Sequence, residues 1–268
     1  MKDFQKRMSI LRNTAKIFLE KFCGPELSCK IKCLYYERLI KNFDLSGEPD
    51  LNMVKLFVHE GDVVFDIGAN IGIYTHYLSK QTGIKGEVHS FEPVPETFVI
   101  LKKIVEKKSL SNVCLNNIAV SESEGTKKMF IPRDEIGFLN YYQAAIKPNN
   151  NADKSDSRSF NVPCISLDNY AKKINKKITF IKCDVEGHEL YVIKGANNLL
   201  QDDRPVWLLE ISSDLNNVNS DAGEIFEIFK KDDYHFYVRE GSALRPYRGD
   251  LTCLNYFLIP IEKTNIFK

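Results

Sequence analysis

The sequence predicts an α/β fold built on an open sheet, and three features indicate it. Strand-like and helix-like segments alternate along most of the chain. The stretch DVVFDIGANIGIYTHYLS, residues 62–79, runs from a β-favouring segment through a turn with two glycines into the start of a helix. Several predicted strands end in an acid, as at Asp66, Glu92 and Asp184. In an open α/β sheet a nucleotide-like ligand binds outside the carboxyl ends of the strands, so these acids mark the expected site.

The glycine turn favours a nucleotide-like ligand without phosphates. A dinucleotide site reads G-x-G-x-x-G, and its second glycine lets the backbone approach a pyrophosphate. Here Gly68 and Gly72 flank Asn70, which stands where the middle glycine would be. Asp66, just before the turn, suits a cationic or donor-rich ligand. S-adenosylmethionine is such a ligand, with a sulfonium, an amino group and a ribose diol; a tight turn of another α/β fold is the alternative.

Composition predicts one cytoplasmic domain with decorations. The chain has 268 residues and a net charge of +1, so no whole-chain basic field argues for nucleic acid as a partner. Its seven cysteines are odd in number and lack the paired spacing of a zinc site, which favours reduced thiols and no metal centre. The sequence has neither an apolar run of about 18 residues nor a signal-peptide pattern. We therefore expect a soluble protein.

Residues 1–50 form a predicted basic, helical segment ahead of a domain over residues 51–268. Residues 1–41 hold ten Lys or Arg against four Asp or Glu. Apolar residues three or four apart between Phe4 and Phe22 predict an amphipathic helix. This helix could have one of three roles: it could pack on the domain body as a lid, mediate dimerisation, or attach the protein to an anionic membrane surface. A basic and aromatic stretch over 30–43 follows, then a break and a short helix over 51–59.

The second and third units supply further ligand candidates. The second strand, over 86–90, leads to Glu92, which lies 24 positions beyond Gly68. That is close to the spacing at which a carboxylate binds ribose hydroxyls, although Glu92 also suits the start of the next helix. The third strand, over 112–120, carries Asn117 near its end, either as a partner for an adenine edge or as a turn residue.

An insertion over residues 121–162 separates the third and fourth units. It begins with a short strand over 127–131 and continues into a polar loop with three consecutive asparagines, 149–151. Long loops in compact domains are usually functional or disordered. This one lies where it could cover an acceptor site.

The fourth unit gathers ionisable side chains at one strand end. The strand over 178–184 delivers Asp184 to the sheet edge that carries the earlier acids. Glu186, His188 and Glu189 follow within six residues, whereas capping a helix needs only one or two. We expect Glu189 to have that capping role. A fifth strand over 206–211, a helix around 222–229 and two last strands, 235–238 and 255–259, complete the prediction.

Six motifs stand in an order that resembles the FkbM family of S-adenosylmethionine-dependent methyltransferases over roughly residues 54–260. They are VVFDIGANIGIYT, FEPVPETF, NIAVSESEG, SLDNY, FIKCDVEGHE and NYFLIP. The resemblance implies a Rossmann-like class I methyltransferase fold, with a seven-stranded, mostly parallel sheet whose last hairpin is antiparallel. It implies methyl transfer to an oxygen of a sugar or natural product, with a glycan, glycolipid or glycosylated metabolite as acceptor. The candidates for binding the cofactor are Asp66, Gly68, Ala69, Asn70, Gly72, Glu92 and Asn117.

Methyl transfer to an alcohol requires alignment and an acceptor for the alcohol proton. Asp184, Glu186 and His188 are the catalytic candidates, with Asp184 or His188 as the base. A divalent cation held by Asp184, Glu186 and Glu210 is a weaker alternative. Many enzymes that methylate nucleic-acid bases have a motif at this strand end in which an Asn or Asp is followed by two prolines and an aromatic residue. Here Asp184 is followed by Val185, Glu186 and Gly187, so that motif is absent. Three rivals remain: a non-catalytic cofactor-binding protein, a methyltransferase with an amine or other small-molecule acceptor, and a nicotinamide-dependent oxidoreductase, which Asn70 disfavours.

Overall fold

The computed structural model describes residues 25–41, 48–135, 137–146, 157–212, 215, 217, 219–249 and 254–267. The chain divides into two compact units, residues 1–43 and 44–268. The amphipathic helix predicted between Phe4 and Phe22 and the three asparagines 149–151 lie outside the described residues. Among the helices that are described, none combines the length and the apolar composition needed to cross a membrane.

The first unit contributes one described helix, α2 (Pro25–Lys41), which covers most of the basic and aromatic stretch. Four large apolar side chains on this helix are exposed. Successive members are four, three and one residues apart in the sequence, which places them on one side of the helix as a stripe. They are Leu27, Ile31, Leu34 and Tyr35.

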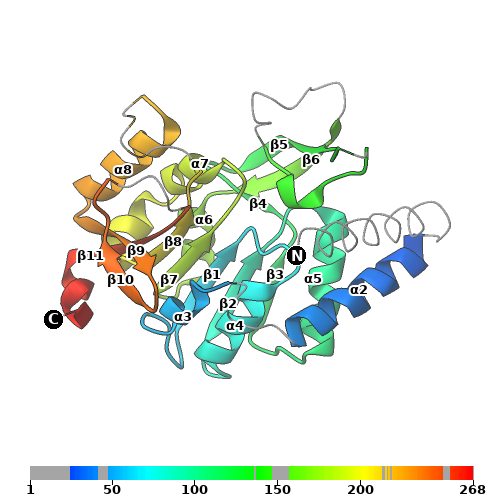
Figure 1. Cartoon of the computed structure of the whole chain (residues 1–268), viewed down its shortest axis with the longest axis horizontal. Helices are drawn as coiled ribbons and strands as arrows, with labels where there is room; N and C mark the ends of the chain where they lie inside the picture. The colour runs from blue at the N-terminus through cyan, green and yellow to red at the C-terminus, as the bar shows by residue number, and fades with distance from the viewer. Residues whose placement is uncertain are drawn as a thin grey trace, which may run out of the picture. The chain divides into compact units, whose positions relative to one another are not determined.

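The second unit is built around an eight-stranded sheet with the strand order β10-β9-β11-β8-β7-β1-β2-β3 (Figure 1). Neighbouring strands from β3 to β8 are parallel, whereas β11 is antiparallel to both β8 and β9, and β10 is antiparallel to β9. The predicted mostly parallel sheet is therefore confirmed, and β10 is an edge strand beyond the seven expected. The bounds are β1 Val63–Ile67, β2 Glu87–Phe91, β3 Val113–Asn116, β7 Phe180–Cys183, β8 Val206–Glu210, β9 Tyr234–Glu240, β10 Ala243–Pro246 and β11 Asn255–Pro260.

Helices cover both faces of this sheet, and alternate residues of β1 point to opposite faces. Phe65 and Ile67 belong to the large apolar core that also contains residues of α7 and α8. Asp66, between them, points to the other face and contacts Thr75 of α4. The helix predicted over 51–59 is a single turn followed by irregular turns. The helices are α3 Leu51–Val54, α4 Ile73–Thr82, α5 Pro95–Lys107, α6 Leu167–Ile174, α7 Glu189–Lys194 and α8 Asp221–Lys231, with short η1 Tyr141–Gln143, η3 Leu199–Asp203 and η4 Ile261–Phe267.

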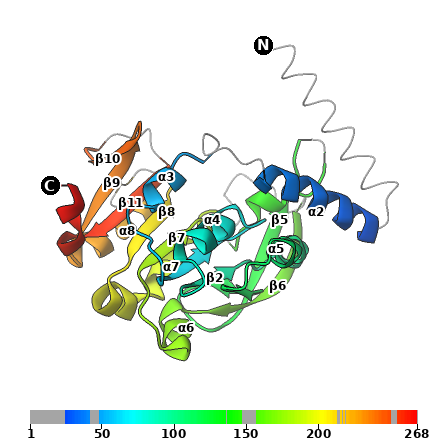
Figure 2. The ribbon, with the colours of Figure 1, turned by 90° about the horizontal axis from the view of Figure 1, so that it is seen from below.

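The predicted insertion forms a second sheet with the order β4-β6-β5. Its strands are β4 Ala119–Val120, β5 Gly125–Pro132 and β6 Ser157–Ile165. The expectation of one strand over 112–120 is wrong, because the chain leaves the main sheet after β3 and joins β6 as β4 two residues later. Figure 2 shows β5 and β6 beside α5, and Val94 at the start of α5 packs into the small core of this second sheet.

Candidate active site

The glycine turn after β1 is held against the ends of two neighbouring strands. Backbone N–H groups of Gly68 and Ala69 both donate to the carbonyl oxygen of Phe91, at 3.0 and 2.9 Å. Gly68 has φ +74°, and a Cβ on it would lie 1.8 Å from the carbonyl oxygen of Asp184. The turn therefore touches the end of β7 so closely that only glycine fits at this position.

Asp66 lies beneath the turn and is fully buried. Its Oδ2 accepts a hydrogen bond of 2.6 Å from Thr75 Oγ1, and Lys182 Nζ lies 3.8 Å from its Oδ1. Burial raises the pKa of Asp66, and the positive charge of Lys182 partly offsets this effect. Asp66 thus contacts α4 and Lys182 from inside the sheet, and direct contact with a cofactor stays a prediction.

Lys182 is a buried cation that ties three parts of the site together. Its Nζ donates to the carbonyl oxygen of Gly68 at 2.9 Å and lies 3.5 Å from Asp184 Oδ2. Burial lowers its pKa, but the carboxylates of Asp184 and Asp66 outweigh burial, so the net shift is upward and the ammonium stays charged. This ammonium holds the Asp184 carboxylate beside the glycine turn.

Glu92 follows β2 and is also buried. Its Oε2 accepts from the backbone N–H of Asn70, and its Oε1 accepts from that of Val94, both at 2.9 Å. Burial raises the pKa of Glu92 to about 7, although the two N–H groups favour the ionised form. An ionised carboxylate has about four acceptor sites, so Glu92 retains capacity for two hydroxyls while also serving the start of α5. Asn117 Nδ2 donates to the backbone carbonyl oxygen of Glu92 at 2.8 Å, so part of its amide holds this turn.

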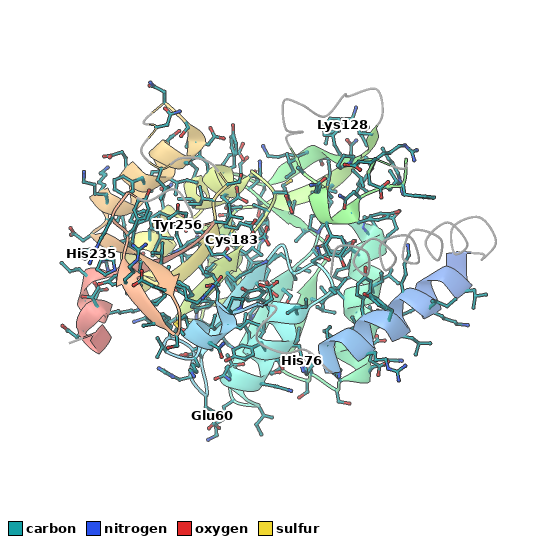
Figure 3. The ribbon with its side chains drawn as sticks, in the orientation of Figure 1. Glu60, His76, Lys128, Cys183, His235 and Tyr256 are labelled. Carbon is teal, nitrogen blue, oxygen red and sulfur yellow. The ribbon has the colours of Figure 1, made fainter. Side chains whose placement is uncertain are left out.

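Two cavities meet at this edge of the sheet. The cavity that contains Glu92, here the Glu92 cavity, has a volume of about 600 Å³ when the open space at its mouth is included. The neighbouring cavity, here the Glu210 cavity, has a volume of about 700 Å³ on the same basis and is lined by Glu48, Lys182 and Glu210 among others. Four residues line both cavities, and they are Gly68, Asn70, Tyr142 and Asp184. Cys183, the last residue of β7, is labelled in Figure 3 and marks the strand end that carries Asp184.

The walls of the two cavities are acidic. Burial, with the charges of Asp184 and Glu210 next in size, raises the pKa of Glu186 to about 7. Burial and the charge of Asp184 likewise raise the pKa of Glu210 to about 7, and burial raises that of Glu48. These carboxyls favour a ligand that carries positive charge or donates hydrogen bonds. Within the ranges given above, no three His, Cys, Asp or Glu side chains are grouped as a metal ion would need.

His188 is buried at the start of α7 and lines the Glu92 cavity. Its Nε2 lies 2.8 Å from Ser121 Oγ, and its ring stacks on Tyr191 with centroids 4.7 Å apart. The neighbouring Glu189 accepts from the backbone N–H groups of Val185 and Gly187, at 3.0 and 3.2 Å. Glu189 therefore holds the turn before α7 and stands in the first turn of that helix, and the capping role expected from the sequence stays a prediction.

The structure brings most of the predicted residues to the cavities. Gly68, Asn70, Glu92, Asp184, Glu186 and His188 line the Glu92 cavity, and Ala69 lines the Glu210 cavity. The linings of both cavities lack three of the candidates, Asp66, Gly72 and Asn117. A cofactor contact for these three stays a prediction.

Sequence reasoning missed Lys182, Ser121 and Tyr142. The sequence did contain an indication of Lys182. A lysine inside the apolar run ITFIKCD is expected to be buried with the strand, and a buried lysine is rarely found without a charged partner. Ser121 resembled an ordinary turn residue, and Tyr142 lies in the part of the insertion that was expected to be a loop. Neither position carried a pattern that distinguished it from its neighbours.

Comparisons with known proteins place this chain among methyltransferases. A family model described as a methyltransferase FkbM domain matches residues 66–236. The hexuronic acid methyltransferase AglP of Haloferax volcanii is 32% identical over 162 residues, which cover 59% of this chain and 60% of that protein. The 31-O-demethyl-FK506 methyltransferase FkbM of Streptomyces tacrolimicus is 36% identical over 70 residues, 26% of each chain. The chain thus spans less than two thirds of the length of these two relatives. Among solved structures, the methyltransferase FkbM from Methylobacillus flagellatus aligns with a TM-score of 0.47 at 17% identity, covering 75% of this chain and 44% of that one.

Proposed function

Because the chain belongs to the FkbM methyltransferase family, we propose that it transfers a methyl group from S-adenosylmethionine to a hydroxyl oxygen of a sugar. The observation that carries this proposal is the pair of cavities that meet at Asp184. One cavity contains a buried carboxyl suited to a ribose, and the other leaves room for a second molecule. A transfer between two ligands needs such a junction.

The residues of the Glu92 cavity fit S-adenosylmethionine. Glu92 has acceptor capacity for the two ribose hydroxyls, and Asn70 keeps the turn from approaching a pyrophosphate. The acidic walls suit the sulfonium and the amino group of the cofactor. When bound, the cofactor supplies an electrophilic methyl group that needs no further activation.

Asp184 is the proposed acceptor of the hydroxyl proton. It lines both cavities, and Lys182 holds its carboxylate from 3.5 Å away. Glu186 and His188 line the Glu92 cavity but are absent from the lining of the Glu210 cavity, which favours Asp184 over them. A positioned base contributes about 10² to 10⁴ in rate, and alignment of the reacting atoms contributes further.

The test is Asp184→Asn, which keeps the shape of the side chain and removes its basicity. We expect kcat to fall by about 10² to 10⁴ while the affinity for S-adenosylhomocysteine, measured by calorimetry, stays within about threefold. Asp221→Asn, in the first turn of α8, is the matched control and should keep full activity. Unchanged kcat in Asp184→Asn would show that another group accepts the proton, and Glu186 would then be the next residue to change.

The sugar acceptor rests on the relatives and needs its own experiment. AglP is named for a hexuronic acid, and it is similar to this chain over 162 residues. We would follow an isotopically labelled methyl group from S-adenosylmethionine into a fractionated cell extract, with Asp184→Asn as the blank. Label in a carbohydrate or glycolipid fraction supports the proposal. Label confined to protein or nucleic acid would replace the sugar with another acceptor.

The leading rival is a protein that binds the cofactor without turnover. Binding of S-adenosylhomocysteine, with no labelled product in any fraction, would favour it. We further propose a cytoplasmic location, since the seven cysteines are odd in number and scattered along the chain, a pattern that favours reduced thiols over a disulfide framework.

A further inference from the structure

The short segment just before α3 forms part of the wall of the Glu210 cavity. Glu48 lines this cavity, and its carbonyl oxygen accepts from the backbone N–H of Leu51 at 3.1 Å. Asp50, two residues further on, is buried and accepts from Arg239 Nε at 2.7 Å and from Asn255 Nδ2 at 2.8 Å. These contacts fasten the segment to β9 and β11, so the fold itself holds Glu48 at the cavity.

Three carboxyl groups from separate parts of the chain line the Glu210 cavity. They are Glu48, Asp184 just after β7 and Glu210 at the end of β8. Burial raises the pKa of Glu48; the charge of Lys182 opposes this rise, and the charges of Asp50 and Asp184 add to it. Burial, and then the charge of Asp184, raise the pKa of Glu210 to about 7. The carboxyls are thus close enough to repel one another, and a further negative charge in the cavity would add to this repulsion.

Lys182 is the only cation among the described residues that line the Glu210 cavity. Its Nζ donates to the carbonyl oxygen of Gly68 and lies 3.5 Å from Asp184 and 3.8 Å from Asp66, so two carboxylates already balance its charge. Its side chain is only 8% exposed, which leaves little of it to reach a ligand. The first turn of α4 also lines the cavity and offers backbone N–H groups to an anion, and the carboxylate of the cofactor is available to occupy that place. The described lining therefore holds no uncompensated positive charge for an acidic acceptor.

Tyr142 gives the junction of the two cavities an aromatic surface. It belongs to η1, lines both cavities and is 49% exposed. A sugar ring has an apolar C–H face and an edge of hydroxyl donors. An aromatic ring binds the face, and carboxyl oxygens accept from the hydroxyl groups. The Glu210 cavity therefore combines the two kinds of contact that a sugar without a negative charge needs.

Resting on the proposed function, we propose that the Glu210 cavity accepts a sugar residue without a carboxylate, either neutral or carrying an amine, and that Glu48 recognises it. Glu48 accepts hydrogen bonds from hydroxyl or ammonium groups of such a sugar, and together with Glu210 it repels the carboxylate of a uronic acid. Specificity of this kind comes from a repulsive element as well as from an attractive one. The acceptor then differs in charge from the hexuronic acid for which AglP is named.

The first test identifies the sugar that receives the methyl group and needs no variant. Carbohydrate that the protein has labelled from isotopically labelled S-adenosylmethionine is hydrolysed, and its monosaccharides are separated by charge. We expect the label in O-methylated neutral or amino sugars. Label in a uronic acid, or released as methanol from a uronic acid methyl ester, would overturn this proposal and leave a sugar as the acceptor. No label in carbohydrate would overturn the sugar acceptor of the proposed function, and this proposal with it.

The second test asks whether Glu48 contacts the acceptor or the cofactor. Glu48→Gln keeps the shape of the side chain and removes its charge, and Glu106→Gln, at an exposed position on α5, is the matched control. With the carbohydrate fraction that takes up the label as substrate, we expect its KM to rise about tenfold in Glu48→Gln and to stay unchanged in the control. The affinity for S-adenosylhomocysteine, measured by calorimetry, should stay within about threefold in both variants. An unchanged KM, or a loss of cofactor affinity in its place, would overturn the role of Glu48.

Discussion

Gly68 illustrates how one residue sets the geometry of the whole site. Its φ of +74° and the 1.8 Å separation from the Asp184 carbonyl oxygen are two independent reasons for glycine. Gly61 has a similar φ of +92°, but a Cβ there would meet nothing within 4 Å. A substitution at Gly61 therefore tests the cost of the positive φ alone, whereas one at Gly68 adds the clash with the Asp184 carbonyl oxygen.

We expect Gly61→Ala to lower the free energy of unfolding by about 1 kcal/mol, because only the backbone is strained. Gly68→Ala should lower it by at least about 3 kcal/mol, because the turn must also move away from β7. Urea denaturation of both variants and the wild type measures the difference. Equal losses would mean that the turn moves away from β7 at little cost.

The pKa of Glu92 predicts a pH dependence of stability. Burial raises this pKa from its ordinary 4.5 to about 7, so the folded protein binds a proton there that the unfolded chain has released. The stabilisation is complete below about pH 4.5 and is lost as the pH rises to about 7. Between pH 4.5 and 8 the free energy of unfolding should therefore decrease less in Glu92→Gln than in the wild type, by on the order of 3 kcal/mol.

Thermal unfolding at several pH values checks the Glu92 prediction, with the exposed Glu60→Gln as control. The control should follow the wild-type curve, and identical curves for Glu92→Gln and the wild type would contradict the assignment. Glu186 and Glu210 also have pKa values of about 7, so part of the pH dependence should remain in every variant.

Strand-end acids were predictable as a group, because parallel strands bring their carboxyl ends to one edge. The sequence alone therefore predicts Asp184 and Glu92 as site residues. The contact between Ser121 and His188 was not predictable, since it depends on how the chain just after β4 packs against α7. Contacts between segments about 70 residues apart leave no local pattern in the sequence.

Among the elements, strands with strong apolar runs were placed well, and the strand predicted over 127–131 lies within β5, but the rest of the second sheet was not predicted. The split between β3 and β4 was missed, because a run such as NVCLNNIAV looks continuous although its two ends pair with different sheets. The edge strand β10 was missed as well, since its sequence ALRP contains an arginine and a proline. Tertiary pairing, rather than local propensity, decides both cases.

The exposed stripe on α2 leads to a prediction about that helix. Leu27, Ile31, Leu34 and Tyr35 are all more than a third exposed, and the same helix carries the exposed cations Lys30 and Arg38. Such a combination favours contact with an anionic membrane surface. We expect the protein to cosediment with vesicles that contain phosphatidylserine and much less with pure phosphatidylcholine.

The variant Leu34→Glu/Tyr35→Glu should lose most of this vesicle binding, because it places two negative charges on the stripe. Leu254→Glu, an exposed apolar position outside α2, is the matched control and should bind like the wild type. Equal binding by all three proteins would leave dimerisation as the role to test for this helix, by analytical ultracentrifugation.

For the whole molecule, cofactor binding should appear as stability. A ligand at 100 times its Kd stabilises the folded state by about 2.7 kcal/mol. For a domain of this size we expect S-adenosylhomocysteine to raise Tm by about 5–10 °C. NAD at the same concentration should leave Tm unchanged, because Asn70 replaces the glycine that a pyrophosphate needs. A Tm shift with NAD alone would instead support the oxidoreductase.

The position of β11 has a consequence for how the protein is made. This strand, Asn255–Pro260, lies between β8 and β9, although it follows both in the chain. During synthesis, β8 and β9 therefore leave the ribosome with a vacant place between them and two unpaired strand edges. Such edges pair readily with other chains. A nascent chain that has released β9 but not yet β11 should thus be aggregation-prone, and it would depend on chaperones until the central gap in the sheet is filled.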